Sequence, residues 1–228
     1  MGYTQLRYSQ DAKLNETFKY ITINYMLITI NKMETIVKTQ KIMVVLLKDF
    51  GSHTATSLSK ELKMSRWGVW KILKKLEKDN FIIIEPIGSG KTSTTTIRLN
   101  WDNILVEKTL ALSLTQEALE YKRWLHDFSS LQQEVDFLIL YGSVLYSKEA
   151  NDIDVIGIAK ERKLAKINDN TFKIQETQNK KIHSINLTQK EFKQELKKPN
   201  KAFLDAIKKG IILFGQENFI KFVKEMQK

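Results

Sequence analysis

The chain of 228 residues contains no cysteine, and this absence excludes several kinds of protein together. A disulfide scaffold, a cysteine-ligated zinc site, an iron–sulfur cluster and a thiol nucleophile all require that residue. Histidine is scarce as well, because the chain has only three, each isolated in the sequence: His53, His126 and His183. A metal site built from histidines is therefore not expected.

Long apolar runs are also absent. A membrane-spanning helix needs about 20 consecutive apolar residues. The nearest approach, residues 21–30, is interrupted by two threonines and an asparagine, and it starts too late in the sequence for a signal peptide. Because 42% of the residues are nevertheless hydrophobic, we expect a soluble, cytoplasmic protein with well-formed cores and no membrane partner.

Positive charge is concentrated in one part of the chain. The formal net charge is +11, and residues 35–100 carry 12 Lys and Arg against 5 Asp and Glu. Residues 101–228 are nearly balanced, with 21 against 18. This distribution favours a polyanion-binding module joined to a second module of different character. The alternative is a solvated lysine-rich surface without a specific partner.

The basic part predicts three helices followed by a β-hairpin. Ser65 is a natural N-cap for the third helix, which we expect over residues 66–79. Its apolar positions recur at intervals of three and four residues and should face inward. Two β-rich runs, 81–84 and 94–99, flank a glycine-bearing turn and predict the hairpin. The inward-facing positions are Val69, Ile72, Leu73 and Leu76.

This order of elements over residues 39–100 resembles the winged helix-turn-helix of bacterial and archaeal transcription regulators. A helix that presents cations near its N-terminus suits the major groove of double-stranded DNA, and the wing offers Lys91 and Arg98 for phosphates. The resemblance implies a homodimer on two half-sites. A winged helix that makes protein contacts through its tryptophans is the alternative. The third helix should expose Arg66, Trp67, Trp70, Lys71, Lys74 and Lys75.

One glycine-rich stretch of the basic part is similar in sequence to a nucleotide-binding loop. Residues 88–92 read Gly-Ser-Gly-Lys-Thr, as at the end of a P-loop. That motif needs an earlier glycine where this chain has Glu85, and it needs a following helix where this chain has a run of β-favouring residues. We therefore assign this stretch to the tip of the wing.

The strongest chemical signal lies in the second module. An apolar strand, residues 137–141, leads into Gly142 and Ser143, and a second strand carries Asp152 and Asp154. Because strand side chains alternate, the two carboxylates should share one face. Two adjacent carboxylates repel unless a cation neutralises them, and oxygen ligands favour Mg²⁺. Gly142 would let the backbone approach a phosphate, and Ser143 would supply a hydroxyl.

These motifs resemble the nucleotidyltransferases of the DNA polymerase beta superfamily, over residues 118–228. The resemblance implies transfer of a nucleoside monophosphate from an NTP, with Asp152 and Asp154 holding Mg²⁺ and with Gly142 and Ser143 holding the β- and γ-phosphates. Two features depart from the family. Only residues 144–151 separate the motifs, and the later strand, 182–187, lacks the family's third acid. Glu176 is the substitute acid that the sequence offers nearby, and His183 is a candidate base with a structural role as its alternative.

We therefore expect an α+β protein with an N-terminal extension (1–34), a winged helix (35–100), a helical connector (101–117) and a nucleotidyltransferase-like domain with a mixed sheet (118–228). The functional hypothesis is a DNA-binding protein that transfers a nucleotide, with ATP as the expected donor, to an unidentified protein or small-molecule hydroxyl. The first alternative is a transcription regulator whose degenerate transferase fold senses nucleotide or mediates dimerisation. A weaker alternative is modification of a nucleic-acid end.

Overall fold

The computed structural model describes residues 34–87, 94–147, 149–198 and 201–227. Contacts divide the chain into two compact units, Met1–Thr39 and Gln40–Lys228. The described residues of the first unit, 34–39, are helical. The expected N-terminal extension lies outside the described residues except for Glu34, and so does the expected wing tip, 88–93.

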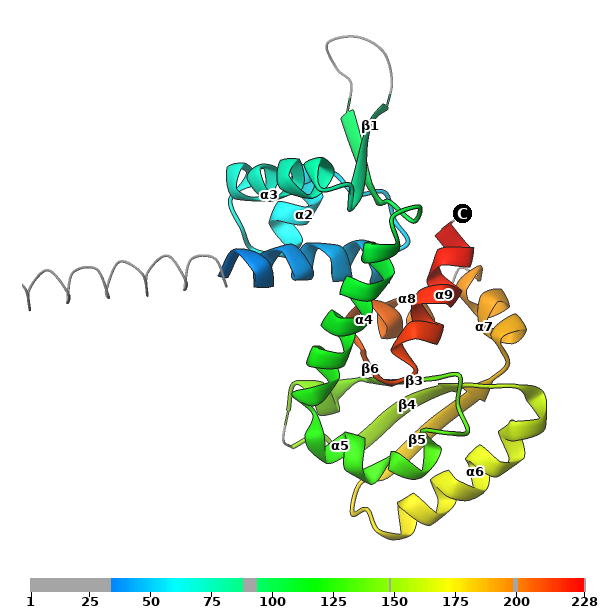
Figure 1. Ribbon diagram of the computed structural model, residues 1–228. Coiled ribbons are helices and arrows are strands. Elements are labelled where there is room, and N and C mark those ends of the chain that lie inside the picture. Colours follow the sequence, from blue (N-terminus) through cyan, green and yellow to red (C-terminus); the bar gives the residue numbers. More distant parts are fainter. Residues whose placement is uncertain (1–33, 88–93, 148, 199–200, 228) are drawn as a thin grey trace, which may run out of the picture. The chain divides into compact units, whose positions relative to one another are not determined.

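The second unit begins with helices and a hairpin. Residues 40–48 are helical, and Thr54 then forms a capping box with Ser57 at the start of the next helix. The Ser65 side chain accepts a hydrogen bond from the Gly68 N–H, as its assignment as N-cap predicts. The elements are α2 (Ala55–Glu61), α3 (Arg66–Lys78), β1 (Ile82–Ile87) and β2 (Thr94–Leu99), with the two strands antiparallel (Figure 1).

The stretch that follows is helical but not continuous. The periodic apolar residues between 101 and 135 predict a return to helix, and the structure places three separate helical elements there: α4 (Ile104–Leu119), α5 (Lys122–Asp127) and a 3₁₀ turn (Ser129–Leu131). The chain leaves helical geometry at Tyr121, whose φ and ψ are −108° and 43°. The apolar spacing continues through this break because Ala118, Phe128 and Leu131 all pack into one cluster.

A four-stranded mixed sheet forms the centre of the C-terminal part. Its order is β5-β4-β3-β6, with β4 and β5 parallel and the other pairs antiparallel. The parallel pair requires a crossover, which α6 (Glu161–Glu176) provides. The strands are β3 (Phe137–Tyr141), β4 (Asp152–Ile158), β5 (Lys181–Leu187) and β6 (Ile211–Phe214).

Helices cover both faces of this sheet (Figure 1). Ile167 and Ile174 of α6 pack with Ile153 and Val155 of β4 on one face. On the other face, Phe137 of β3 lies within 6.1 Å, centroid to centroid, of three phenylalanine rings. Those rings belong to α7 (Gln189–Leu196) and α9 (Gln216–Gln227), and α8 (Ala202–Lys209) lies between these helices in the sequence.

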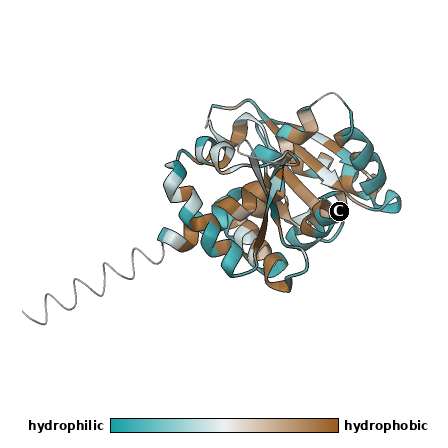
Figure 2. Cartoon of the chain, turned by 90° about the horizontal axis from the view of Figure 1, so that it is seen from above, coloured by the Kyte–Doolittle hydropathy of each residue, from teal (hydrophilic) through white to brown (hydrophobic). Residues whose placement is uncertain are grey.

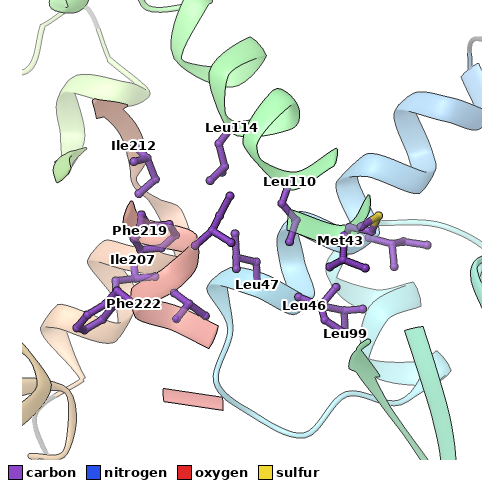
Figure 3. Packing of buried hydrophobic residues seen from close by; sticks show 14 of the residues in the cluster. Met43, Leu46, Leu47, Leu99, Leu110, Leu114, Ile207, Ile212, Phe219 and Phe222 are labelled. Carbon is purple, nitrogen blue, oxygen red and sulfur yellow. The ribbon is translucent and has the colours of Figure 1, made fainter. Parts of the chain in front are cut away.

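One apolar core connects the N-terminal helices with the sheet. Leu46 and Leu47 from residues 40–48 belong to the same buried cluster as residues of α4, α8 and α9. Figure 3 shows Leu47 in the middle of this cluster, between Leu110 and the side chains of α8 and α9. The buried Lys48 adds polar contacts, because its Nζ lies 2.7 Å from Glu117 Oε2 and 2.8 Å from the Gly210 carbonyl oxygen.

The predicted α+β class and the mixed sheet are confirmed. Hydrophobic residues gather where helices and strands pack, and hydrophilic residues lie along the outer helices (Figure 2). Among the residues that the structure describes, none of the helices has both the length and the apolar character of a membrane span.

Candidate functional site

The glycine–serine turn lies directly against one of the predicted carboxylates. β3 ends at Tyr141, and Gly142 adopts φ 83° and ψ −164°. A Cβ atom at position 142 would lie 2.2 Å from Asp154 Oδ2, which no real side chain tolerates. Position 142 therefore requires glycine for two reasons, its positive φ and this close approach to Asp154. Ser143 follows on an exposed 3₁₀ turn, Ser143–Leu145.

The two aspartates lie on β4 as the alternating pattern predicts. Asp152 and Asp154 are half-buried, whereas Ile153 and Val155 are fully buried and pack toward α6. The carboxylates therefore belong to the opposite face of the sheet, at the end where β4 begins. Their side chains can reach a ligand, because 25% of the Asp154 side chain remains exposed.

The neighbouring strands place a polar residue beside each aspartate. Asp154 is in register with Tyr141 of β3 and with His183 of β5, and Asp152 is in register with Lys181 of β5. His183 Nδ1 lies 3.3 Å from Asp154 Oδ1. Burial raises the pKa of the Tyr141 phenol, and the charge of Asp154 raises it further. Tyr141 therefore stays neutral at pH 7.

Neither the predicted substitute acid nor a carboxylate on β5 completes this group. Glu176 lies in the last turn of α6, and α6 packs against the face of the sheet opposite to the aspartates. β5 reads Lys-Ile-His-Ser-Ile-Asn-Leu and carries no acid. His183, the candidate base, does lie beside Asp154.

The candidate DNA-binding helix α3 has the two predicted faces. Its four apolar positions are buried, and all six residues named for DNA contact are exposed. Trp67 has 74% of its surface exposed, and Lys71 Nζ lies 5.5 Å from its ring centroid. Lys74 Nζ lies 5.0 Å from the Trp70 ring. The outward face of α3 is therefore a row of indoles interleaved with ammonium groups.

Four of the predicted DNA contacts have polar partners of their own or lie outside the description. One is Lys74, whose Nζ lies 2.8 Å from Glu77 Oε2. The Arg66 guanidinium donates to Thr56 Oγ1 of α2. Arg98 Nη2 lies 2.9 Å from Glu85 Oε1 across the hairpin, and this bond and charge lower the pKa of the Glu85 carboxyl. Lys91 lies outside the described residues.

A second group of charged residues was not predicted from the sequence. Ligand atoms of Asp49, His53 and Glu61 all lie within 4.8 Å of one another. Lys208 of α8 joins them, with its Nζ 2.6 Å from Asp49 Oδ2 and 3.2 Å from Glu61 Oε1. We call these four residues the Lys208 cluster. Because 159 residues separate Lys208 from Asp49, no local sequence signal indicates the cluster.

Comparison of the chain with protein-family models, with curated proteins and with solved structures finds no match. Function must therefore be argued from the residues themselves.

Proposed function

We propose that the protein is a Mg²⁺-dependent nucleotidyltransferase whose basic N-terminal helices bind double-stranded DNA. One observation supports the catalytic activity: Gly142 of the turn lies so close to Asp154 that a Cβ there would be 2.2 Å from Oδ2, and a second aspartate lies two residues away on the same strand. Such a turn brings backbone N–H groups and the Ser143 hydroxyl beside a carboxylate pair, which suits a triphosphate bound with a divalent cation.

In the proposed reaction an acceptor hydroxyl attacks the α-phosphorus of the NTP. The new bond joins the acceptor oxygen to phosphorus, the bond between the α-phosphorus and the bridging oxygen breaks, and pyrophosphate leaves with that electron pair. The hydroxyl proton passes to solvent or to a basic group. ATP is the expected donor, and the acceptor is a protein or small molecule.

The residues present fit a magnesium ion. Asp152 and Asp154 supply the anionic oxygen ligands that Mg²⁺ prefers, and the glycine at position 142 leaves the Asp154 carboxylate the room that a Cβ would take. When bound, the ion neutralises triphosphate charge and favours departure of pyrophosphate. Gly142 and Ser143 would hold the β- and γ-phosphates, and the exposed position of Ser143 leaves its hydroxyl accessible.

The catalytic half is tested by incubating the purified protein with α-labelled NTPs, Mg²⁺ and a bacterial or archaeal lysate. We expect one or more labelled products in the presence of the wild-type protein, and their loss with the double variant Asp152→Asn/Asp154→Asn. Asp169→Asn is the matched control, because Asp169 is an exposed acid on α6. Equal labelling by all three proteins would reject the assignment of the site.

The DNA-binding half is supported by the exposed face of α3. Lys71 and Lys75 have no carboxylate within 4.0 Å among the described residues, so their charges are available to phosphates. The tryptophans beside them offer flat apolar surfaces at the same face. We propose that the protein binds as a homodimer to two half-sites, the arrangement that suits a helix in the major groove.

Salt dependence tests this half. Each phosphate contact contributes a slope of about −0.9 to the plot of log affinity against log salt. Replacing Lys71 and Lys75 with alanine should therefore reduce the magnitude of the slope by about 2. The same change at Lys173 and Lys166, on the exposed side of α6, removes equal charge and should leave the slope nearly unchanged. A wild-type affinity that is independent of salt would contradict DNA binding through phosphates.

A regulator that only senses nucleotide is the second candidate. The observation that favours it is the pair of basic residues, Lys181 and His183, at the positions where the family's third acid is expected. Mg²⁺-dependent stabilisation by NTP without a labelled product would favour the sensor over the enzyme.

A further inference from the structure

The two aspartates of the candidate site face basic residues, in register, on a single neighbouring strand. β5 is an edge strand of the sheet and runs parallel to β4, so it is the neighbour that flanks both carboxylates on that side. Asp152 is paired with Lys181, and Asp154 is paired with His183. Both basic residues are exposed, and 44% of the His183 side chain reaches solvent.

Among the described residues in register with the two aspartates, none carries a third carboxylate. The alternate residues of β5 face α6, where the Ile182 N–H donates to Gln175 Oε1 at 2.7 Å and Asn186 Nδ2 donates to Asn168 Oδ1 at 2.8 Å. On the other side of Asp154 lies Tyr141, a phenol in register with it. Within the described part of the chain, the only group of three or more acidic or histidine ligands close enough for a metal is that of Asp49, His53 and Glu61.

This arrangement limits the number of cations that the protein's own side chains can bind at the site. Two-metal phosphoryl-transfer sites place their ions about 3.5–4 Å apart, and the mutual repulsion of two divalent ions at that separation demands several carboxylates. Asp152 and Asp154 give one ion its anionic protein ligands, and a second ion would have to share them because no third acid is in register beside them. A lysine beside them repels a second cation and attracts phosphate oxygens.

We propose that the site holds one divalent cation rather than two, and that Lys181 takes the charge-neutralising place of the second by contacting the phosphates of the nucleotide. His183 acts as a positioning residue, because its ring nitrogen lies within 3.3 Å of the Asp154 carboxylate and occupies the space beside it. This inference rests on the proposed function of the same site and names which of its residues contact the substrate.

Manganese is the probe for the number of ions, because its free and bound forms are distinguished by electron paramagnetic resonance. We expect the full-length protein, saturated with a non-hydrolysable ATP analogue, to bind one Mn²⁺ in all, the ion that Asp152 and Asp154 share with the phosphates of the analogue. His183→Asp supplies the missing acid and should bind a second. Two ions on the wild-type protein, or still only one on His183→Asp, would overturn the inference.

The role of Lys181 has a separate readout, the affinity for the analogue at saturating Mn²⁺. Loss of one charge-assisted phosphate contact should weaken binding about tenfold in Lys181→Ala, and Lys181→Arg should recover most of it. Lys173→Ala, on the opposite face of the sheet, is the matched control and should bind like the wild type. Unchanged affinity in Lys181→Ala would reject its assignment as a phosphate ligand.

These outcomes separate the inference from the function on which it rests. If the wild-type protein binds neither analogue nor Mn²⁺ at Asp152 and Asp154, the proposed function fails and the inference fails with it. If it binds the analogue with two ions, the function stands and only the inference fails. Melting temperatures of the Lys181 and His183 variants check folding, and we expect small changes because both side chains are exposed.

Discussion

The Lys208 cluster and the candidate active site contain the same kinds of side chain and use them differently. Each combines two carboxylates with one histidine and one lysine. In the first, Lys208 Nζ lies within 3.2 Å of both carboxylates. In the second, Lys181 makes no ion pair within 4.0 Å with any described residue, and the carboxylates face a glycine turn. The position of the lysine therefore distinguishes the Lys208 cluster, whose carboxylates are already paired, from the candidate active site, whose lysine is not paired with them.

The difference follows from the elements that supply the residues. Asp49 follows the helical residues 40–48, Glu61 ends α2 and Lys208 lies in the last turn of α8, so the first cluster connects three parts of the second unit. Asp152, Asp154, Lys181 and His183 come from two adjacent strands, on which His183 contacts Asp154 at 3.3 Å while Lys181 forms no ion pair with the described residues. Composition alone does not distinguish the two arrangements.

The largest expected effect is on catalysis. Asp154→Asn keeps the size of the side chain but removes a charge that Mg²⁺ requires, so the rate of nucleotide transfer should fall about 1000-fold or more. Stability should change little, because the side chain is partly exposed. Initial rates and thermal melts of the same preparation check both statements, and a variant with near wild-type activity would remove the distinction between the two clusters.

A smaller but still large effect is expected at the turn. Gly142→Ala forces a Cβ to within 2.2 Å of Asp154 Oδ2 at a φ of 83°, which displaces the carboxylate or the turn. We expect nucleotide affinity to fall about tenfold or more and the free energy of unfolding to fall by about 1–2 kcal/mol. Calorimetric titration with Mg²⁺ and ATP measures the first quantity, and urea unfolding measures the second. Wild-type affinity would show that the turn does not contact the nucleotide.

A substitution in the Lys208 cluster should lower stability and leave nucleotide transfer unchanged. Lys208→Met removes both ion pairs and should lower the free energy of unfolding by about 1 kcal/mol, a modest value because water screens side chains that are 26–37% exposed. The transfer rate should stay within about twofold of wild type, since no residue of this cluster is part of the candidate site. Loss of transfer in a folded Lys208→Met protein would show that the two clusters are coupled.

The smallest expected effect is the pH dependence of the difference in stability between wild type and Lys208→Met. Burial acts to raise the pKa of the Asp49 carboxyl, but the bonds from Lys208 and from the Gly51 N–H outweigh it, and the pKa is lowered. A lowered carboxyl pKa adds stability above its unfolded value of about 3.9, and that stability is lost as the pH falls through the folded value. The stability gap between wild type and Lys208→Met should therefore be present at pH 6 and shrink below about pH 4.

The pKa of Lys208, the other partner of this ion pair, shifts in the opposite direction. The bond to Asp49 raises the pKa of Lys208 despite the opposing effect of burial. A raised lysine pKa adds stability that is fully present below the unfolded value of about 10.4 and is lost as the pH rises through the folded value. Urea unfolding at a series of pH values measures the gap, and a gap that widens below pH 4 would contradict the assignment of the ion pair.

Local signals in the sequence predicted much of the fold. The apolar run 137–141 predicted the limits of β3, and Ser65 marked the start of α3, because burial and capping act over a few residues. The crossover helix α6 was missed. Its inward residues Ile167, Thr171 and Ile174 have helical spacing, but they lie within a predominantly polar stretch whose helical character depends on packing against the sheet.

The candidate site was predictable in part for the same reason. The glycine–serine turn and the two aspartates follow from short motifs, whereas their pairing with Lys181 and His183 depends on which strands are neighbours and in which register. The Lys208 cluster depends on contacts between residues far apart in the sequence. Such arrangements are decided by tertiary packing, and no local pattern encodes them.

The position of the label in the transferred group tests the central claim most directly. Parallel reactions contain ATP labelled at the α- or the γ-phosphate, with Mg²⁺ and the acceptor fraction. Nucleotidyl transfer at Asp152 and Asp154 predicts that the α-label enters the product and that the γ-label appears in pyrophosphate, both only with the unmodified aspartates. A product that carries the γ-label, or α-labelling that persists in Asp152→Asn/Asp154→Asn, would contradict the account.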